Sequence, residues 1–186
     1  FGMGRKKIRT VTTHHGAMIR PDLRSRLYER LYALLARWRA DLMCSVSESE
    51  YRLLRERGWP KSRLVLHRNG IDRPALTWDE KNNACRANEF RFVTVARLSP
   101  EKNHLRLFAV MKEFNKISAQ PWHLDVVGSG PLEAQLKNLR HSLGLENRIR
   151  FLGFMPEAWQ LVHNYQLLLL FSLGEGLPVA VLEAAW

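Results

Sequence analysis

From Phe90 onward the chain alternates short apolar runs with helical patterns, and this alternation constrains the fold more than any other feature. It predicts strands and helices in turn over residues 90–96, 102–117, 122–127, 131–143, 148–152, 157–164 and 166–171, with a last helix from Pro178. Short apolar strands separated by helices are typical of an α/β domain with a parallel sheet. Ligands of such sheets bind in the loops beyond the carboxyl ends of the strands. Functional residues are therefore expected in those loops.

The residues before Phe90 predict a second, smaller set of strands and helices. Strands are expected over residues 8–13, 42–46 and 63–66, and helices from Pro21 and from Ser47 to about Arg57. Ser47 and Glu50 have the three-residue spacing of a capping box. Residues 74–88 are polar and lack periodicity, so we place a linker there. The predicted organisation is a first domain over residues 1–73, a linker over 74–88 and a second domain over 89–186.

The net charge of +11 is concentrated in the first domain, where residues 1–73 hold 17 Lys and Arg against 7 Asp and Glu. Such a region attracts the phosphates of nucleic acids, anionic lipids or phosphorylated acceptors. Its helix from Leu23 to Arg39 has leucines at three- and four-residue steps, with arginines on other faces. We hypothesise that this helix lies on an anionic membrane. Packing on the sheet, with solvated arginines, is the alternative.

The two cysteines and the two ends of the sequence lead to expectations about the cellular location of the protein and about whether the sequence is a fragment. Cys44 and Cys85 are isolated, so the sequence suggests neither a disulfide framework nor a zinc site. No apolar run approaches the roughly 20 residues that span a bilayer. We expect a cytoplasmic protein, peripheral on the inner face of the cell membrane. Because the sequence begins at Phe1 and stops at Trp186 within a predicted helix, we expect a fragment.

Two loops of the second domain carry candidate phosphate-binding residues. Arg97 and Lys102 lead into a helix, where cations are unfavourable unless an anion such as a diphosphate is bound. Solvation, or pairing with Glu101, is the alternative. Gly128 and Gly130 follow the next strand and allow a ligand to approach the backbone, or they form a plain turn.

Phe154 follows the third strand of the second domain. It is placed either to face a flat base or to pack into the core.

The loop from Gly174 to Leu177 precedes the last helix and brackets Glu175 with glycines. The helix start at Pro178 directs free N–H groups into this loop, so the backbone of Gly176 and Leu177 is a candidate phosphate site. Glu175 and Glu183 would accept hydrogen bonds from sugar hydroxyls, unless they are merely exposed.

His14 and His15 end a strand of the first domain, directly before Gly16. A histidine at this place faces a substrate, or it is a structural residue.

The order of these motifs resembles that of the retaining glycosyltransferases of family 4, which have the two-domain GT-B fold. The motifs run Ser45-Val46-Ser47-Glu48-Ser49, Asn69-Gly70-Ile71-Asp72, Val95-Ala96-Arg97-Leu98 with Lys102, Val127-Gly128-Ser129-Gly130-Pro131, Phe151-Leu152-Gly153, and Glu175 with Glu183. The resemblance implies two Rossmann-like domains with parallel sheets. The chain would hold the end of the N-terminal domain and most of the C-terminal, donor-binding domain.

The resemblance also assigns roles to single residues. Arg97 and Lys102 would bind the donor diphosphate, Glu175 would lie by the donor sugar, and Glu183 would hold the ribose hydroxyls. His15 would lie near the transferred sugar, with His14 as the other register. Backbone contacts are implied for Gly16, Gly128 and Gly130. Asn103 departs from the glycine that often follows the lysine in this family.

The implied reaction moves a sugar from a nucleotide-diphosphate sugar to a hydroxyl of a glycan or lipid-linked acceptor, with retention of configuration. It would serve polysaccharide, lipopolysaccharide or glycolipid synthesis. No metal or cofactor is expected, because Arg97 and Lys102 would stabilise the leaving diphosphate. Other hypotheses are a noncatalytic nucleotide-binding fragment and a GT-B epimerase or phosphorylase. Nucleic-acid binding is not expected, because no aromatic residues are interleaved with the basic ones in a recognisable fold.

Overall fold

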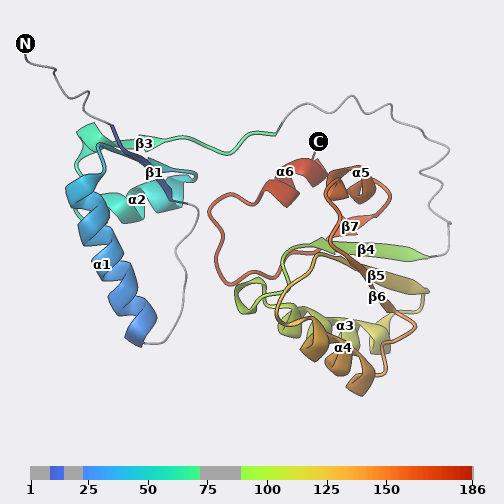
Figure 1. Ribbon diagram of the computed structural model, residues 1–186. Helices are drawn as coiled ribbons and strands as arrows, with labels where there is room; N and C mark the ends of the chain where they lie inside the picture. The colour runs from blue at the N-terminus through green and yellow to red at the C-terminus, as the bar shows by residue number, and fades with distance from the viewer. Residues whose placement is uncertain (1–8, 15–22, 72–88, 186) are drawn as a thin grey trace, which may run out of the picture. The chain divides into compact units, whose positions relative to one another are not determined.

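The computed structural model describes residues 9–14, 23–71 and 89–185, and its contacts divide the chain into two units (Figure 1). The first unit takes the residues up to Asn69 together with Gly174–Leu177, and the second takes Gly70–Leu173 and Pro178–Trp186. The predicted linker over residues 74–88 lies outside the described residues, so the predicted boundaries stay a prediction. The contacts differ from that prediction in assigning Gly174–Leu177 to the first unit.

The first unit is built on a parallel three-stranded sheet in the order β1-β2-β3. Its elements are β1 (Val11–His14), α1 (Leu23–Arg39), β2 (Leu42–Ser45), α2 (Glu48–Glu56), η1 (Lys61–Arg63) and β3 (Leu64–Leu66). Its core consists of buried residues from the strands, from α2 and from the loops beside them: Ala40, Met43, Leu54, Trp59 and Leu64. Both helices and all three strands lie close to the positions that the sequence predicts.

Helix α2 shows how local chemistry sets its ends. Ser47 Oγ accepts a hydrogen bond from the backbone N–H of Glu50 (3.3 Å), which confirms Ser47 as the N-cap. The carboxylate of Glu50 does not return to Ser47, because its Oε2 accepts from the backbone N–H of Val46 (3.3 Å). Gly58, with a φ of 85°, ends the helical segment and allows Trp59 to turn into the core.

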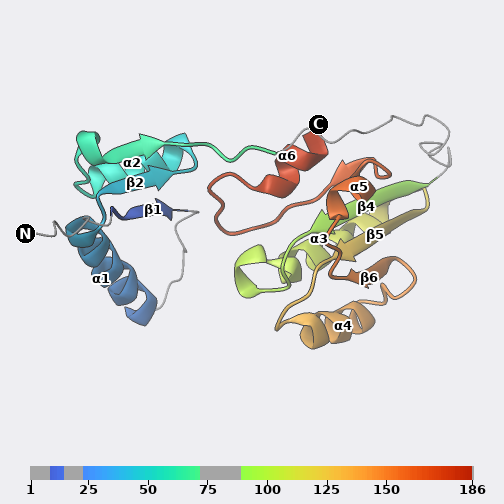
Figure 2. The ribbon, with the colours of Figure 1, turned by 45° about the horizontal axis from the view of Figure 1, so that its top comes forward.

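The second unit is built on a parallel four-stranded sheet in the order β6-β5-β4-β7. Its elements are β4 (Phe90–Val95), η2 (Pro100–Lys102), α3 (His104–Ile117), β5 (Trp122–Val127), α4 (Glu133–Ser142), β6 (Ile149–Gly153), α5 (Ala158–Val162), β7 (Leu167–Leu168) and α6 (Val179–Ala185). Helices α3 and α4 cover one face of the sheet, while α5 and α6 lie on the other (Figures 1 and 2).

Alternate side chains of β5 face opposite sides of the sheet, which explains why helices cover both faces. Trp122, Leu124 and Val126 pack in the core under α3 and α4, whereas Val127 packs with α5. Asp125 also points toward the α5 face and is 1% exposed. Its carboxylate accepts hydrogen bonds from Arg150 (2.7 and 2.8 Å) and from the hydroxyl of Tyr165 (2.6 Å), so a buried charge on this face is compensated.

Two elements of the second unit differ from their predicted lengths. The helix predicted from Lys102 begins at His104, because Asn103 adopts the left-handed conformation (φ 54°) between η2 and α3. The strand predicted over 166–171 is only Leu167–Leu168, and beyond it the backbone N–H of Leu173 donates to the carbonyl of Glu101 (2.8 Å). The predicted α/β class with parallel sheets in both units is confirmed. Within the described ranges, no helix has the length and apolar character needed to cross a membrane.

Candidate functional site

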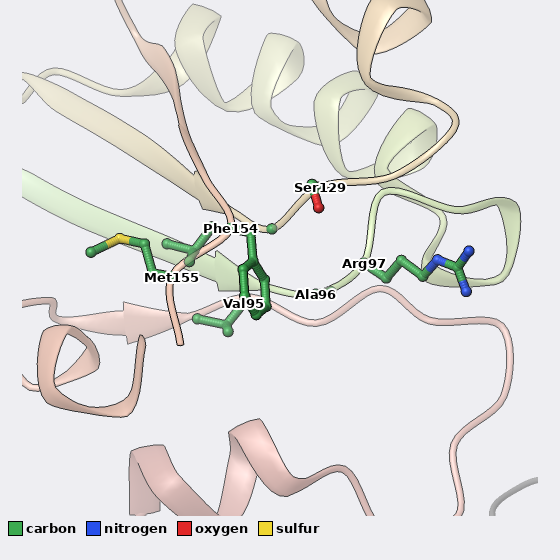
Figure 3. Close-up of a pocket in the computed structure, with 8 residues that line it drawn as sticks. Val95, Ala96, Arg97, Ser129, Phe154 and Met155 are labelled. Carbon is green, nitrogen blue, oxygen red and sulfur yellow. The ribbon is translucent and has the colours of Figure 1, made fainter. Parts of the chain in front are cut away.

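A pocket of about 370 Å³ lies at the carboxyl ends of β4, β5 and β6, where the sequence predicts ligand-binding loops (Figure 3). It is lined by Val95, Ala96, Arg97, Val127, Gly128, Ser129, Phe154 and Met155. Phe154 is 72% exposed, which excludes the core-packing interpretation of this side chain. The pocket therefore combines apolar side chains, the backbone of a glycine loop and one arginine.

The glycines beside the pocket are required by the protein's own backbone. A Cβ atom on Gly128 (φ 141°) would lie 2.0 Å from the carbonyl oxygen of Ala96. A Cβ atom on Gly130 would lie 2.4 Å from the carbonyl oxygen of Leu98. The backbone N–H of Leu98 donates to the carbonyl of Ser129 (3.0 Å), which ties the two loops together. Close packing of the loops accounts for both glycines, and their predicted contact with a ligand stays a prediction.

Arg97 and Lys102 lie in the single loop between β4 and α3, as the sequence predicts. Arg97 is exposed, and Figure 3 shows its guanidinium directed away from Phe154. Lys102 is half-buried at the end of η2. The sequence offers Glu101 as an alternative to a diphosphate as the partner of these cations. Glu101 Oε1 accepts a hydrogen bond from Ser99 Oγ (2.6 Å). The loop thus holds one cation at the pocket, Arg97, and a second cation, Lys102, at the end of η2. Binding of a diphosphate by the two stays a prediction.

His104 is a buried residue of this loop region that sequence reasoning missed. It is 1% exposed, and neither ring nitrogen has a hydrogen-bond partner among the described residues. Burial, and then the charge of Lys102, lower the pKa of His104 to about 4. The signal was present in the spacing, because His104, Phe108 and Met111 occur at helical steps and form the buried face of α3.

The loop Gly174–Leu177 packs within the first unit. Asn69 Nδ2 donates a hydrogen bond to the carbonyl of Leu177 (2.7 Å). A Cβ atom on Gly176 would lie 2.7 Å from Val46 Cγ2 and 2.8 Å from Glu50 Oε1, so only glycine fits without displacing a neighbour. Sequence reasoning used Asn69 only as part of a turn motif and did not predict this contact.

The two acidic candidates of the last motif belong to different units. Glu175 is half-buried in the loop of the first unit, and Glu183 is half-buried on α6 of the second unit. The described α6 starts directly after Pro178, whose carbonyl accepts from the backbone N–H groups of Val181 (3.1 Å) and Leu182 (3.4 Å). The predicted helix start is confirmed. The sugar-binding roles of the two glutamates stay predictions.

A histidine and a glutamate meet at the end of β1. His14 pairs with Ser45 in the sheet register, and its Nδ1 lies 3.5 Å from Glu50 Oε1. Both of these atoms are buried. His15 and Gly16 lie outside the described residues, so the role predicted for His15 is untested. Glu50 was interpreted from the sequence only as a helix cap.

A metal site has no support from side-chain clustering in the described part of the chain. There, no group of three or more His, Cys, Asp or Glu residues is arranged to hold a metal ion. The chemistry available at the pocket is that of cations, backbone groups and aromatic surface.

Comparison with known proteins identifies the family. The chain matches the model described as "Glycosyl transferases group 1" over residues 78–185 and that described as "Glycosyltransferase Family 4" over residues 2–73. It is 29% identical to the UDP-Gal:alpha-D-GlcNAc-diphosphoundecaprenol alpha-1,3-galactosyltransferase of Escherichia coli, over 85% of this chain and 43% of the relative. It is 28% identical to the amylovoran biosynthesis glycosyltransferase AmsK of Erwinia amylovora, over 94% of this chain and 44% of the relative.

A solved structure shares the fold. HepE of Anabaena in complex with UDP-glucose superposes with a TM-score of 0.75 at 23% identity, covering 95% of this chain and 50% of HepE. This similarity supports the predicted GT-B fold class. The chain spans less than half the length of the two curated relatives. The match to the first family model covers more than half of the chain, and the chain belongs to the glycosyl transferases of group 1.

Proposed function

We propose that the protein containing this chain is a glycosyltransferase that moves a sugar from a nucleotide-diphosphate sugar to an acceptor hydroxyl. The proposal is supported by the family and by the E. coli relative, whose name gives UDP-Gal as donor and a diphosphoundecaprenol-linked sugar as acceptor. The acceptor is a glycan or a lipid-linked glycan, in polysaccharide, lipopolysaccharide or glycolipid synthesis. The configuration at the transferred carbon is retained.

The observation that carries the proposal is the pocket at the ends of β4, β5 and β6. Its volume of about 370 Å³ falls in the roughly 300–1,000 Å³ range of small-molecule sites. Phe154 and Met155 offer an apolar wall to a base, and the exposed face of Phe154 suits stacking. Arg97 on the same rim supplies a positive charge for phosphate.

Four charged residues of the chain have separate roles in the proposed reaction. Arg97 and Lys102 neutralise the diphosphate as the bond between the anomeric carbon and the phosphate oxygen breaks. The acceptor oxygen forms the new bond on the same face of the sugar, and its proton passes to the departing phosphate. Glu175 accepts hydrogen bonds from the donor sugar, and Glu183 accepts them from the ribose. The proposed reaction uses no metal or cofactor, because the two cations stabilise the leaving group.

Ligand-observed NMR on this chain with UDP, GDP and ADP tests the donor site. Saturation transfer to one of these nucleotides, weakened in Arg97→Ala and Glu183→Ala, is the expected result. The matched control is Lys116→Ala, which removes an exposed positive charge paired with Glu113 at the far end of α3. Binding that is equal in all four proteins would contradict the donor-site assignment. A folded chain that binds none of the nucleotides would mean that the donor site needs parts of the protein outside this chain, or that the protein is not a glycosyltransferase.

We also propose that α1 attaches the protein to the cytoplasmic face of an anionic membrane. The apolar stripe of this helix is exposed, between 51% and 75% for Leu27, Leu31, Leu34, Leu35 and Trp38. Arg37 and Arg39 are exposed in its last turn. Leucines and a tryptophan beside arginines are typical of helices that lie in the membrane interface.

Vesicle cosedimentation tests this attachment. Binding is expected to rise with the fraction of anionic lipid and to fall in a Trp38→Ser/Arg39→Gln double variant. The control is an Arg52→Gln variant, which removes an exposed arginine of α2. Cosedimentation that does not depend on anionic lipid would exclude the membrane surface as a partner.

A further inference from the structure

Glu50 differs from the other acids of its helix in being buried without full compensation. Its side chain is 6% exposed, whereas the side chain of Glu48 on the same first turn is 51% exposed. Oε2 accepts one hydrogen bond, from the backbone N–H of Val46 at 3.3 Å. Oε1 is buried and has no hydrogen-bond partner among the described residues. A carboxylate buried in this way is costly, so a helix cap alone does not account for it.

The neighbour of Oε1 is the ring of His14. Nδ1 of His14 is also buried without a hydrogen-bond partner in the described chain, and it lies 3.5 Å from Oε1. Each atom is thus positioned to satisfy the other after a small movement. Such contacts are often long in ligand-free enzymes and shorten when substrate binds.

We infer that Glu50 is a positioning residue that holds the imidazole of His14 with its proton on Nδ1. An ionised carboxylate only accepts hydrogen bonds, so Nδ1 must be the donor of the pair. The other ring nitrogen, Nε2, is then left as an acceptor for a hydroxyl of the transferred sugar. This role rests on the proposed function, but the pairing itself does not.

Gly176 adds a second constraint on the pair. A methyl group at this position would lie 2.8 Å from Glu50 Oε1 and 3.0 Å from its Cδ. The backbone of the loop that carries Glu175 therefore packs directly on the carboxylate. The atoms that this methyl group would crowd are side-chain atoms, Val46 Cγ2 at 2.7 Å and the Glu50 carboxylate, rather than backbone atoms. We therefore expect Gly176→Ala to displace these side chains and to alter the pair.

The test that needs no substrate is the tautomer of His14. The ¹⁵N shifts of its ring are measured on the full chain at pH 8, where histidine side chains are ordinarily neutral. A His14→Gln variant identifies its signals among those of the 7 histidines. We expect the Nδ1–H form in the wild-type chain, and a larger Nε2–H fraction in Glu50→Gln and in Gly176→Ala. The control Glu48→Gln removes the same charge from the same turn and is expected to change nothing.

Two results of this measurement would overturn the inference. One is a wild-type His14 with its proton on Nε2. The other is a set of ring shifts that is identical in the wild-type chain and in Gly176→Ala. If Glu50→Gln does not fold, Gly176→Ala decides the outcome, since this variant leaves both His14 and Glu50 unsubstituted.

Steady-state kinetics of the intact protein test the positioning role. We expect Glu50→Gln to lower kcat about 10- to 100-fold with the donor KM within two-fold, because a group that orients the reacting sugar acts mainly on the chemical step. A kcat equal to that of Glu48→Gln would refute the role. If the wild-type protein transfers no sugar, the proposed function fails, and the tautomer measurement still decides whether Glu50 and His14 are paired.

Discussion

His104 makes the stability of the second unit depend on pH in a defined direction. Its folded pKa of about 4 lies below the ordinary value of 6.5, because burial and the charge of Lys102 disfavour the imidazolium. The unfolded chain therefore binds more protons than the folded chain at intermediate pH. This contribution to stability is complete above pH 6.5 and is lost as the pH falls toward 4.

The size of the effect follows from the two pKa values. Each pH unit inside the window from 6.5 to 4 costs about 1.4 kcal/mol, so lowering the pH from 8 to 5 costs roughly 2 kcal/mol. Urea unfolding followed by the amide NMR signals of β5 measures the stability of the second unit by itself. We compare the wild-type chain with His104→Leu. Leucine suits this buried position, because the imidazole of His104 makes no hydrogen bond with the described residues that the substitution would remove.

The difference between the two proteins isolates His104 from other titrating groups. His104→Leu is expected to lose about 2 kcal/mol less than the wild-type chain between pH 8 and pH 5. His67→Leu, at an exposed position of the first unit, is expected to follow the wild-type chain. Equal pH dependence in His104→Leu and the wild-type chain would show that the buried imidazole is not what makes the second unit acid-sensitive.

Three further outcomes follow from the second unit. Arg150→Ala removes the charged partner of the buried Asp125 carboxylate and should cost roughly 1.5–3 kcal/mol in urea unfolding. Lys137→Ala, which breaks an exposed ion pair, should cost under about 1 kcal/mol. Equal costs for the two variants would refute the argument. Gly128→Ala should cost at least about 2 kcal/mol, and Gly144→Ala, with positive φ but open space, only about 1–2 kcal/mol. Phe154→Ala should weaken nucleotide binding about five-fold in an NMR titration, and an unchanged Kd would exclude base stacking.

The strands and helices were predictable because their signals are local. Apolar runs and helical spacing located every element of the sheet in the second unit, with errors of a few residues at the ends. The errors have tertiary causes. Asn103 takes a left-handed conformation and delays α3, and β7 stops at Leu168 because the following chain leaves the ladder and bonds to Glu101 near Leu173. Neither cause can be read from spacing within one segment.

The reasons for the glycines were less accessible from sequence. Gly128 and Gly130 were interpreted either as openings for a ligand or as a plain turn, and the atoms that crowd their missing Cβ positions belong to Ala96 and Leu98. Those atoms lie about thirty residues earlier in the chain and are brought near only by the β4–β5 pairing. A glycine motif therefore indicates that something approaches the backbone, and the fold decides whether this is a ligand or the protein itself.

The same reasoning explains why Glu50 and Gly176 could not be linked from sequence. One was interpreted as a helix cap and the other as part of a phosphate-binding loop, at positions 126 residues apart. In the first unit the missing side chain of Gly176 leaves room for the carboxylate, and Asn69 fixes the next residue of the loop through the carbonyl of Leu177. The motif at Glu175 therefore depends on residues of the first unit for its backbone position. Its glycine is explained by contact with Glu50 before any phosphate is considered.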